Sequence, residues 1–179
     1  MLLKNFPVMT IDFRFHYSQT EDRLAITASN GDSTAVMYLT RFLAERFLNA
    51  LGDAIEKTSP AIRNAPAYSA EVLAFEHEQA LVQTTGGTEF TPVPSTLPQD
   101  KTYRLVSTID ITPRADGRMQ IVFRNSDDRL TMELAQDALH VMHSQVLGLA
   151  TLANWKLDVK TPWLFAATTG GADASKLTH

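Results

Sequence analysis

One pattern occurs twice in this chain, and it limits the possible folds more than any other feature. The stretch DRLAITASNGDSTAVMYLT covers residues 22–40, and the similar stretch GRMQIVFRNSDDRLTMELA covers residues 117–135. Both stretches alternate apolar and polar residues on either side of a central asparagine. That alternation is typical of two β-strands joined by a tight turn. The sequence therefore predicts the same β-hairpin in two copies.

The alternation in the first copy also predicts which residues pair. A two-residue turn at residues 30–31 (Asn-Gly) places Leu24 opposite Met37 and Arg23 opposite Tyr38. Residues that are directly opposed share a face of the sheet. We therefore expect Leu24, Ile26, Met37 and Leu39 on an inner face, and Arg23, Thr27, Thr34 and Tyr38 on an outer face.

The second copy gives a parallel result. A turn at residues 125–126 (Asn-Ser) places Met119 opposite Met132 on the inside and Arg118 opposite Glu133 on the outside. A register shift of one residue would exchange the two faces. Both copies therefore predict an apolar inner face and an outer face that begins with an arginine.

Each hairpin is preceded by another alternating segment and followed by a helical pattern. VMTIDFRFHY (residues 8–17) places Phe13, Phe15 and Tyr17 on one face, and in YRLVSTIDIT (residues 103–112) Ile109 and Ile111 are the counterparts of the two phenylalanines. Apolar stripes then predict a helix after each hairpin, with Thr40 as the N-cap of the first. The stripes consist of Leu43, Phe47, Ala50, Leu51 and Ala54 in the first helix and Leu139, Met142, Val146, Leu149 and Ala153 in the second.

The predicted fold class is α+β: two pseudo-symmetric β-β-β-α repeats at about residues 8–57 and 103–155, with meander sheets covered by helices. A helix is expected at about residues 69–84 between the repeats, and residues 163–179 are expected to form a C-terminal tail. WKLDVK (residues 155–160) is a possible short strand. Six strands and three helices suit one two-layer domain, so residues 1–179 are expected to be a single domain.

Composition excludes several kinds of chemistry. The chain has 179 residues, no cysteine and a formal net charge of −4. Disulfides, thiolate nucleophiles and cysteine-bound metals are therefore excluded, and acidity argues against a protein that coats duplex DNA. No segment has the length and apolarity of a membrane span or the pattern of a signal peptide, so a cytoplasmic protein without a membrane partner is expected. No phosphate-binding loop or nucleophile elbow occurs, so no catalytic residue is assigned and no cofactor is expected.

Three histidines are the candidates for an enzyme or a metal site. His140 and His143 are three residues apart on the second helix, so they could share a metal with His77 or Glu133 as a further ligand. The helical pattern places His140 on a polar, solvated face and His143 at its boundary. His77 lies between two glutamates and could act as a carboxylate-supported general base. The commoner roles for a histidine such as His77 are at a helix surface or at the packed edge of a core.

The outer sheet faces carry the candidate binding residues: Arg14, His16, Arg23 and Tyr38 in the first copy, and Arg118, Arg124 and Arg129 in the second. Arginines beside an aromatic side chain on a sheet can bind single-stranded nucleic acid through phosphate contacts and base stacking. The two-copy sheet-and-helix arrangement resembles, in topology, the PUR and Whirly single-strand binders. Those families have four strands before each helix where three are predicted here, and no sequence motif is shared.

Apolar residues outside the predicted inner faces favour a different function. The residues concerned are Val36 and Val122 on the sheets, Phe42, Leu48 and Ile55 on the first helix, and Trp163, Leu164 and Phe165 before the tail. A contiguous exposed apolar patch marks a partner surface, and an internal repeat suggests a fused dimer. The favoured hypothesis is therefore a non-catalytic protein-interaction or assembly module, which could also self-associate. Single-stranded nucleic-acid binding is the alternative, and an enzyme or metal site the second alternative.

Overall fold

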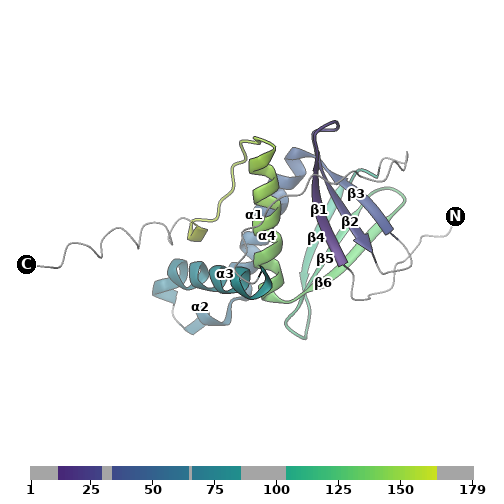
Figure 1. Cartoon of the computed structure of the whole chain (residues 1–179). Coiled ribbons are helices and arrows are strands. Elements are labelled where there is room, and N and C mark those ends of the chain that lie inside the picture. Colours follow the sequence, from purple (N-terminus) through teal and green to yellow (C-terminus); the bar gives the residue numbers. More distant parts are fainter. Residues whose placement is uncertain (1–11, 30–33, 65, 86–103, 165–179) are drawn as a thin grey trace, which may run out of the picture.

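The computed structural model describes residues 12–29, 34–64, 66–85 and 104–164 (Figure 1). The first repeat consists of β1 (Asp12–Ser18), β2 (Arg23–Ser29), β3 (Thr34–Leu39) and α1 (Arg41–Thr58). The second consists of β4 (Thr108–Pro113), β5 (Met119–Arg124), β6 (Arg129–Leu134) and α4 (Gln136–Leu152). Two three-stranded antiparallel sheets, each followed by a helix, confirm the predicted fold class. Within the described ranges, every helix falls short of the length and apolarity needed to cross a membrane.

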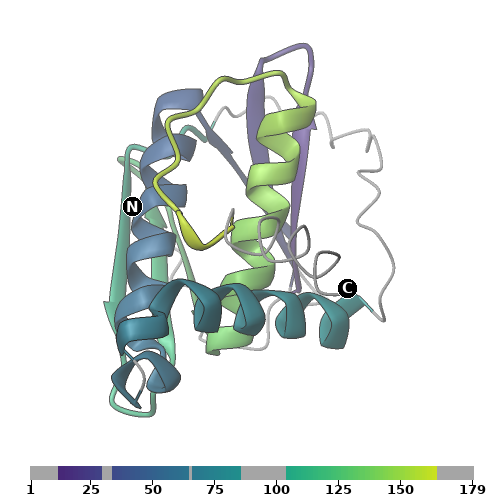
Figure 2. The same ribbon diagram turned by 90° about the vertical axis from the view of Figure 1, so that its left-hand side faces the viewer.

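The described part of the segment between the repeats is helical. It forms α2 (Pro60–Asn64), the 3₁₀ turn η1 (Pro66–Tyr68) and α3 (Ser69–Thr85), which confirms the predicted inserted helix. The Thr40 hydroxyl accepts a hydrogen bond from the Leu43 N–H at 3.3 Å, so Thr40 caps α1 as expected. The inserted helix α3 packs across α4, as Figure 2 shows at the lower end of the helical layer.

The predicted strand pairings are wrong by two residues in both hairpins. Leu24 pairs with Leu39 and Tyr38 pairs with Ala25, so Tyr38 does not face Arg23. In the second copy Met119 pairs with Leu134 and Glu133 pairs with Gln120, so Glu133 does not face Arg118. A shift of two residues keeps every side chain on its predicted face because the strand period is two. The inner faces are therefore confirmed although the partners are not.

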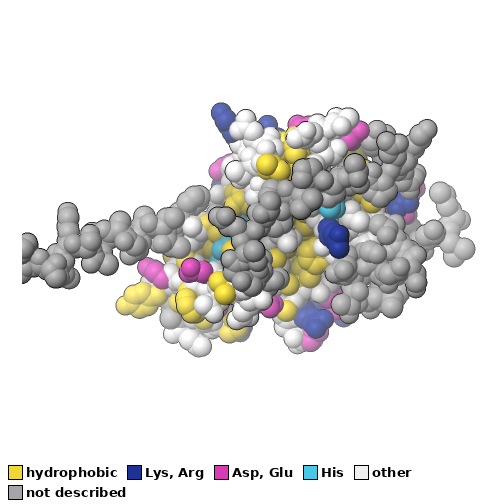
Figure 3. Space-filling view, viewed as in Figure 1, with side chains coloured by type: hydrophobic (Ala, Val, Ile, Leu, Met, Phe, Trp, Pro, Cys, Tyr) yellow, Lys and Arg dark blue, Asp and Glu magenta, His cyan; other side chains and the backbone are white. Residues whose placement is uncertain are grey.

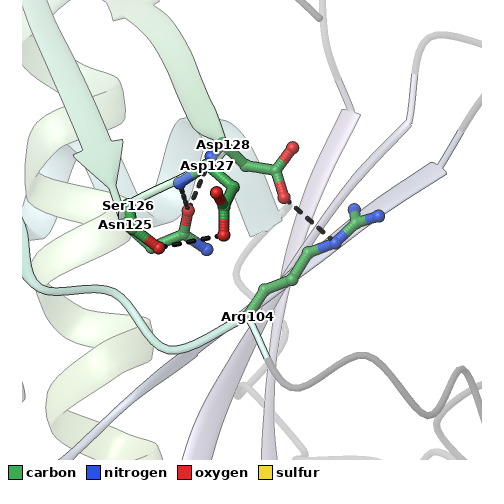
Figure 4. A network of polar contacts seen from close by, with 5 residues as sticks. All are labelled: Arg104, Asn125, Ser126, Asp127 and Asp128. Carbon is green, nitrogen blue, oxygen red and sulfur yellow. Dashed lines mark hydrogen bonds and ion pairs between the residues drawn. The ribbon is translucent and has the colours of Figure 1, made fainter. Parts of the chain in front are cut away.

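Asn125 explains the shift in the second hairpin. Its side-chain oxygen accepts hydrogen bonds from the backbone N–H groups of Asp127 (2.8 Å) and Asp128 (2.6 Å), and its own N–H donates to the Asp128 carbonyl (3.0 Å) (Figure 4). The asparagine thus starts a four-residue loop instead of standing at the centre of a two-residue turn. In the first hairpin the ladder ends at the pair of residues 29 and 34, and residues 30–33 lie outside the described part.

A short segment before β4 joins the two sheets. The Tyr38 N–H donates to the Arg104 carbonyl and the Val106 N–H donates to the Tyr38 carbonyl, both at 2.9 Å. This parallel bridge places residues 104–106 beside β3. An ion pair from Arg104 to Asp128 (3.3 Å) ties the same segment to the β5–β6 loop (Figure 4). The two repeats are therefore linked through their backbone as well as through their core.

Each helix packs against the sheet of the other repeat, and α1 also packs against the sheet of its own repeat. α4 lies against β1, whereas α1 lies against β4 and β2, and the two helices run side by side (Figure 2). Phe47 of α1 contacts Phe123 of β5 with ring centroids 5.3 Å apart. One hydrophobic cluster contains buried residues of both sheets and of α1 and α4. The exchange of helices means that neither repeat buries its own inner face alone.

The chain after α4 does not form the predicted strand. Asn154 has a positive φ of 54°, and the Trp155 N–H donates to the Ala150 carbonyl at 2.9 Å, which ends the helix and reverses the chain. Residues 155–163 then run along α1 and α4 (Figure 2), and we call them the strap. Side chains of α1 bond the strap backbone instead of another strand: Asn49 bonds the Asp158 carbonyl and the Lys160 N–H at 2.9 and 2.7 Å.

Candidate functional site

The three candidate histidines come together around one tryptophan. His77 of α3 and His140 of α4 face each other with their Nδ1 atoms 3.2 Å apart. The Trp163 ring of the strap lies 5.2, 5.7 and 5.5 Å from the rings of His77, His140 and His143, measured between centroids. We call these four residues the histidine cluster. It joins the inserted helix, the last helix and the strap.

The prediction of a solvated His140 and a rim His143 is wrong. His140 is 1 % exposed and His143 is fully buried, because α3 covers the face of α4 that the helical pattern marked as polar. His140 Nε2 and both ring nitrogens of His143 have no hydrogen-bond partner among the described residues. Burial of unpartnered imidazole nitrogens is costly, and it is far more costly when the ring is charged.

These surroundings keep the cluster neutral at pH 7. Burial lowers the pKa of His77 to about 4, and burial together with the neighbouring His77 lowers the pKa of His140 to about 4. The pKa of His143 falls to about 3 for the same reasons, with repulsion from His140 added. The contact between His77 and His140 is therefore an N–H···N hydrogen bond between two neutral rings, one donating and one accepting.

Within the described ranges, the polar contact of His77 is with His140 and not with a carboxylate. Its neighbour Glu76 instead accepts hydrogen bonds from the Ser59 hydroxyl (3.0 Å) and from the Gln136 amide (3.2 Å). Those bonds fix α3 to the end of α1 and to the start of α4. Among the described residues the cluster therefore has the geometry of a packing contact, and general-base catalysis by His77 stays a prediction.

The described residues do not supply a complete ligand set for the predicted metal site. Glu133, the other suggested ligand, forms an ion pair with Arg114 (3.4 Å) on the second sheet and accepts a hydrogen bond from Gln120 (3.3 Å). Among the residues that the structure describes, no group of three histidine, aspartate or glutamate side chains is arranged to hold a metal ion. Metal binding by His140 and His143 therefore stays a prediction.

The predicted outer-face residues lie on two different sheets. In the first sheet Arg14 is exposed, His16 is half-buried, Arg23 forms an ion pair with Glu21 (3.4 Å) and Tyr38 is buried. In the second sheet Arg118, Arg124 and Arg129 are exposed. Arg124 forms an ion pair with Asp110 at 2.6 Å and pairs directly with Arg129 across the hairpin. The nucleic-acid hypothesis remains a prediction, and carboxylates beside two of its arginines weaken it.

An open groove lies between α1 and β4. Two adjoining cavities of about 450 and 320 Å³ share Ala50 of α1 and Ile109 of β4. We call them together the α1–β4 groove. Phe42, which is 66 % exposed, lines one end. Ile111 and Pro113 of β4 line the other end.

The helical stripe predicted Ala50 to be buried, but Ala50 is exposed because the groove beside it is empty of described side chains. Leu48 and Ile55, which the sequence grouped with Phe42 as surplus apolar residues, are fully buried in the core. The sequence did contain one signal for the groove. The counterparts of Phe13 and Phe15 in the second repeat are the smaller Ile109 and Ile111, and a smaller side chain leaves space beside the helix.

Comparisons with known proteins return no match: no family model, no curated protein and no solved structure is detectably similar to this chain. The three strands before each helix also differ from the four of the PUR and Whirly families.

Proposed function

We propose that this protein is a protein-binding module, and that the α1–β4 groove receives an extended apolar segment of a partner polypeptide. The observation that carries the proposal is the pair of adjoining cavities that follows one helix and one strand and shares Ala50 and Ile109. A concave, mostly apolar channel of this shape suits a peptide better than a compact metabolite.

The strand beside the groove supports an extended partner. Among the described residues β4 pairs only with β5, so it is an edge strand of its sheet. An edge strand offers backbone N–H and C=O groups to a further strand, and alternate side chains of that strand then enter pockets. A segment added to β4 would direct every second side chain between the sheet and α1.

The lining of the groove supports apolar side chains in the partner. Its floor contains Ile109 and Ile111, which are half-buried against the core, and Phe42 lies exposed at one end. Charged groups are confined to the helix side, where Arg46 lines one cavity and Lys57 forms a long contact of 4.0 Å with Asp53 in the other. Such a rim can orient a peptide, whereas the apolar floor supplies the affinity.

A selection experiment tests this proposal. Short random peptides displayed on phage are selected on the wild-type protein and then tested on an Ala50→Trp variant, in which the indole would fill the shared part of the groove. We expect enriched peptides that alternate apolar and polar residues and bind the variant at least about tenfold more weakly. Amide hydrogen exchange in β4 should slow when such a peptide binds, because its edge groups become paired.

A matched variant controls for the added indole. Glu56→Trp places the same ring on an exposed position of α1 that does not line either cavity. This variant should bind the selected peptides like the wild type. Enrichment of peptides that bind all three proteins equally, or no enrichment at all, would overturn the proposal.

A further inference from the structure

The outer surface of η1 and α3 carries a regular row of mostly apolar residues. Leu73 and Ala80 are buried on its inner side, against the rest of the protein, yet Tyr68, Phe75 and Val82 are 65 %, 62 % and 50 % exposed. With the half-buried Val72 and the polar Gln79 they form positions spaced by four, three, four and three residues, beginning at Tyr68 of η1, which we call the α3 seam. That spacing is the a/d pattern by which one helix packs along another.

A cavity adjoins the α3 seam. It measures about 370 Å³ and is lined by Phe75, Gln79 and Gln83 of α3 and by Asp137 and His140 of α4. A helix lying along the seam would place large side chains beside Phe75, where this cavity can take them. The seam therefore has both parts of a helix-binding surface: projecting side chains and a recess to receive others.

The charges around the seam restrict its partner. Ser69–Thr85 contains Glu71, Glu76 and Glu78 and no lysine or arginine. In the view of Figure 3, hydrophobic and acidic side chains lie next to one another over the α3 end of the molecule, without a basic side chain among them. A second copy of this chain would bring the same carboxylates against each other, which is unfavourable at the flanks of paired helices. Glu71 and Glu78 are exposed along one flank of the seam, so a partner helix that carries lysine or arginine on that side would find opposite charges there.

We infer that the α3 seam is a docking surface for an amphipathic helix of another protein, with apolar residues at its a/d positions and basic residues beside them. This surface is separate from the α1–β4 groove: it takes a helix, whereas the groove would take an extended segment. It does not depend on the groove being occupied.

A model peptide tests the inference. A synthetic helix with leucine at the a and d positions and lysine at the flanking e and g positions is labelled, and its binding is followed by fluorescence anisotropy at low ionic strength. We expect saturable binding that weakens with added salt. A scrambled peptide of the same composition, and a peptide with glutamate in place of lysine, should bind at least about tenfold more weakly.

Two exposed phenylalanines provide matched variants. Phe75→Glu should reduce affinity for the lysine peptide by about tenfold or more, whereas Phe42→Glu, at an equally exposed position on α1, should leave it unchanged. Both variants should keep the wild-type unfolding midpoint, since both side chains are exposed. Ala50→Trp should also bind the peptide normally, which separates this inference from the proposal for the groove.

Charge reversal examines the acidic flanks. The double variant Glu71→Lys and Glu78→Lys should prefer the glutamate peptide over the lysine peptide. Equal binding of ordered and scrambled peptides, or equal loss in the two phenylalanine variants, would overturn the inference. So would a dimer in light scattering that Phe75→Glu dissociates, because the seam would then belong to a second copy.

Discussion

The two places where a helix crosses onto the other repeat differ in how they are filled. Between β1 and α4 the space holds Phe13, Phe15 and Tyr17, and Trp155 closes it with an edge contact to Tyr17 at 5.9 Å between centroids. Between β4 and α1 the corresponding side chains are Ile109 and Ile111, and a groove remains open. The same architecture therefore yields a closed core on one side and an accessible channel on the other. The difference is one of side-chain volume and not of topology.

Of the substitutions that test this difference between the two sides, replacement of Trp155 should lower the free energy of unfolding most. The indole is buried, and its N–H donates to Asp22 at 2.7 Å, so Trp155→Ala would open the first repeat and leave that carboxylate with one partner fewer. We expect the free energy of unfolding to fall by about 3–5 kcal/mol, measured by urea denaturation. Trp155→Phe, which keeps an aromatic ring but not the N–H, should lower the free energy of unfolding by clearly less. Equal losses in both variants would contradict a closing role for the ring.

Acid should weaken the packing of α4 more than that of α1, because α4 carries two histidines of the histidine cluster and α1 carries none. The folded protein keeps His77, His140 and His143 neutral down to pH about 4, 4 and 3, whereas unfolded histidines titrate near 6.5. The unfolded state therefore binds more protons between these values, and stability falls as the pH drops from about 6.5 towards 4. For His140 alone the loss approaches about 3 kcal/mol.

Denaturation at a series of pH values checks this expectation. His140→Phe should flatten the slope between pH 6.5 and 4 by about one proton. Asp22 provides an internal contrast: hydrogen bonds from Trp155 and Tyr17 lower its pKa below 3.8, so its contribution is lost only under more acidic conditions. A slope in His140→Phe equal to that of the wild type would exclude the cluster as the cause.

Gly52 of α1 lies beneath the strap, so a substitution there tests how closely the strap packs on this helix. A Cβ at this position would come within 2.6 Å of the Thr161 methyl group, and Thr161 is buried. Gly52→Ala should therefore destabilise the protein by about 1–3 kcal/mol in spite of the better helix propensity of alanine. The double variant with Thr161→Ser removes the methyl group and should recover most of the loss. If the losses of stability in the two single variants simply add in the double variant, the contact between residue 52 and the Thr161 methyl group is not the cause of the loss in Gly52→Ala.

Conversion of the second repeat towards the first should have the smallest effect on stability. Ile109→Phe adds apolar area to an open groove, so we expect the free energy of unfolding to rise by about 1 kcal/mol or less. Peptides selected on the wild-type groove should bind this variant poorly. The reverse change, Phe15→Ile, should cost about 1–2 kcal/mol, because Phe15 is already buried. A strong loss of stability in Ile109→Phe would mean that the groove cannot take a larger side chain.

The sequence predicted the faces of the strands but not their partners. Alternation is a property of each strand alone, so Leu24 and Ile121 were assigned correctly to the core. The register depends on the length of the turn. The side chain of Asn125 favours a four-residue loop, and the Asn-Ser dipeptide alone does not predict that length. An error of two residues then changed every predicted cross-strand pair without changing a face.

The candidate site was less predictable because its parts come from distant segments. His77 and His140 are 63 positions apart, and the pattern of α4 alone contains no sign that α3 will cover it. Apolar residues on more than one side of a helix, as in α3, indicate that the helix packs against the rest of the protein on one side and can bind a partner on another. The α1–β4 groove could have been anticipated from isoleucine in place of phenylalanine, but only with the helix exchange known.

The helix exchange also affects how the chain can reach its native state. Trp155, which lies after the last helix, bonds to Asp22 across 133 positions of sequence. Contacts of such separation require most of the loop-closure entropy to be lost before they contribute, so they are associated with slow folding. During synthesis β1 must wait for nearly the whole chain before α4 can cover it, and its apolar side chains are exposed meanwhile.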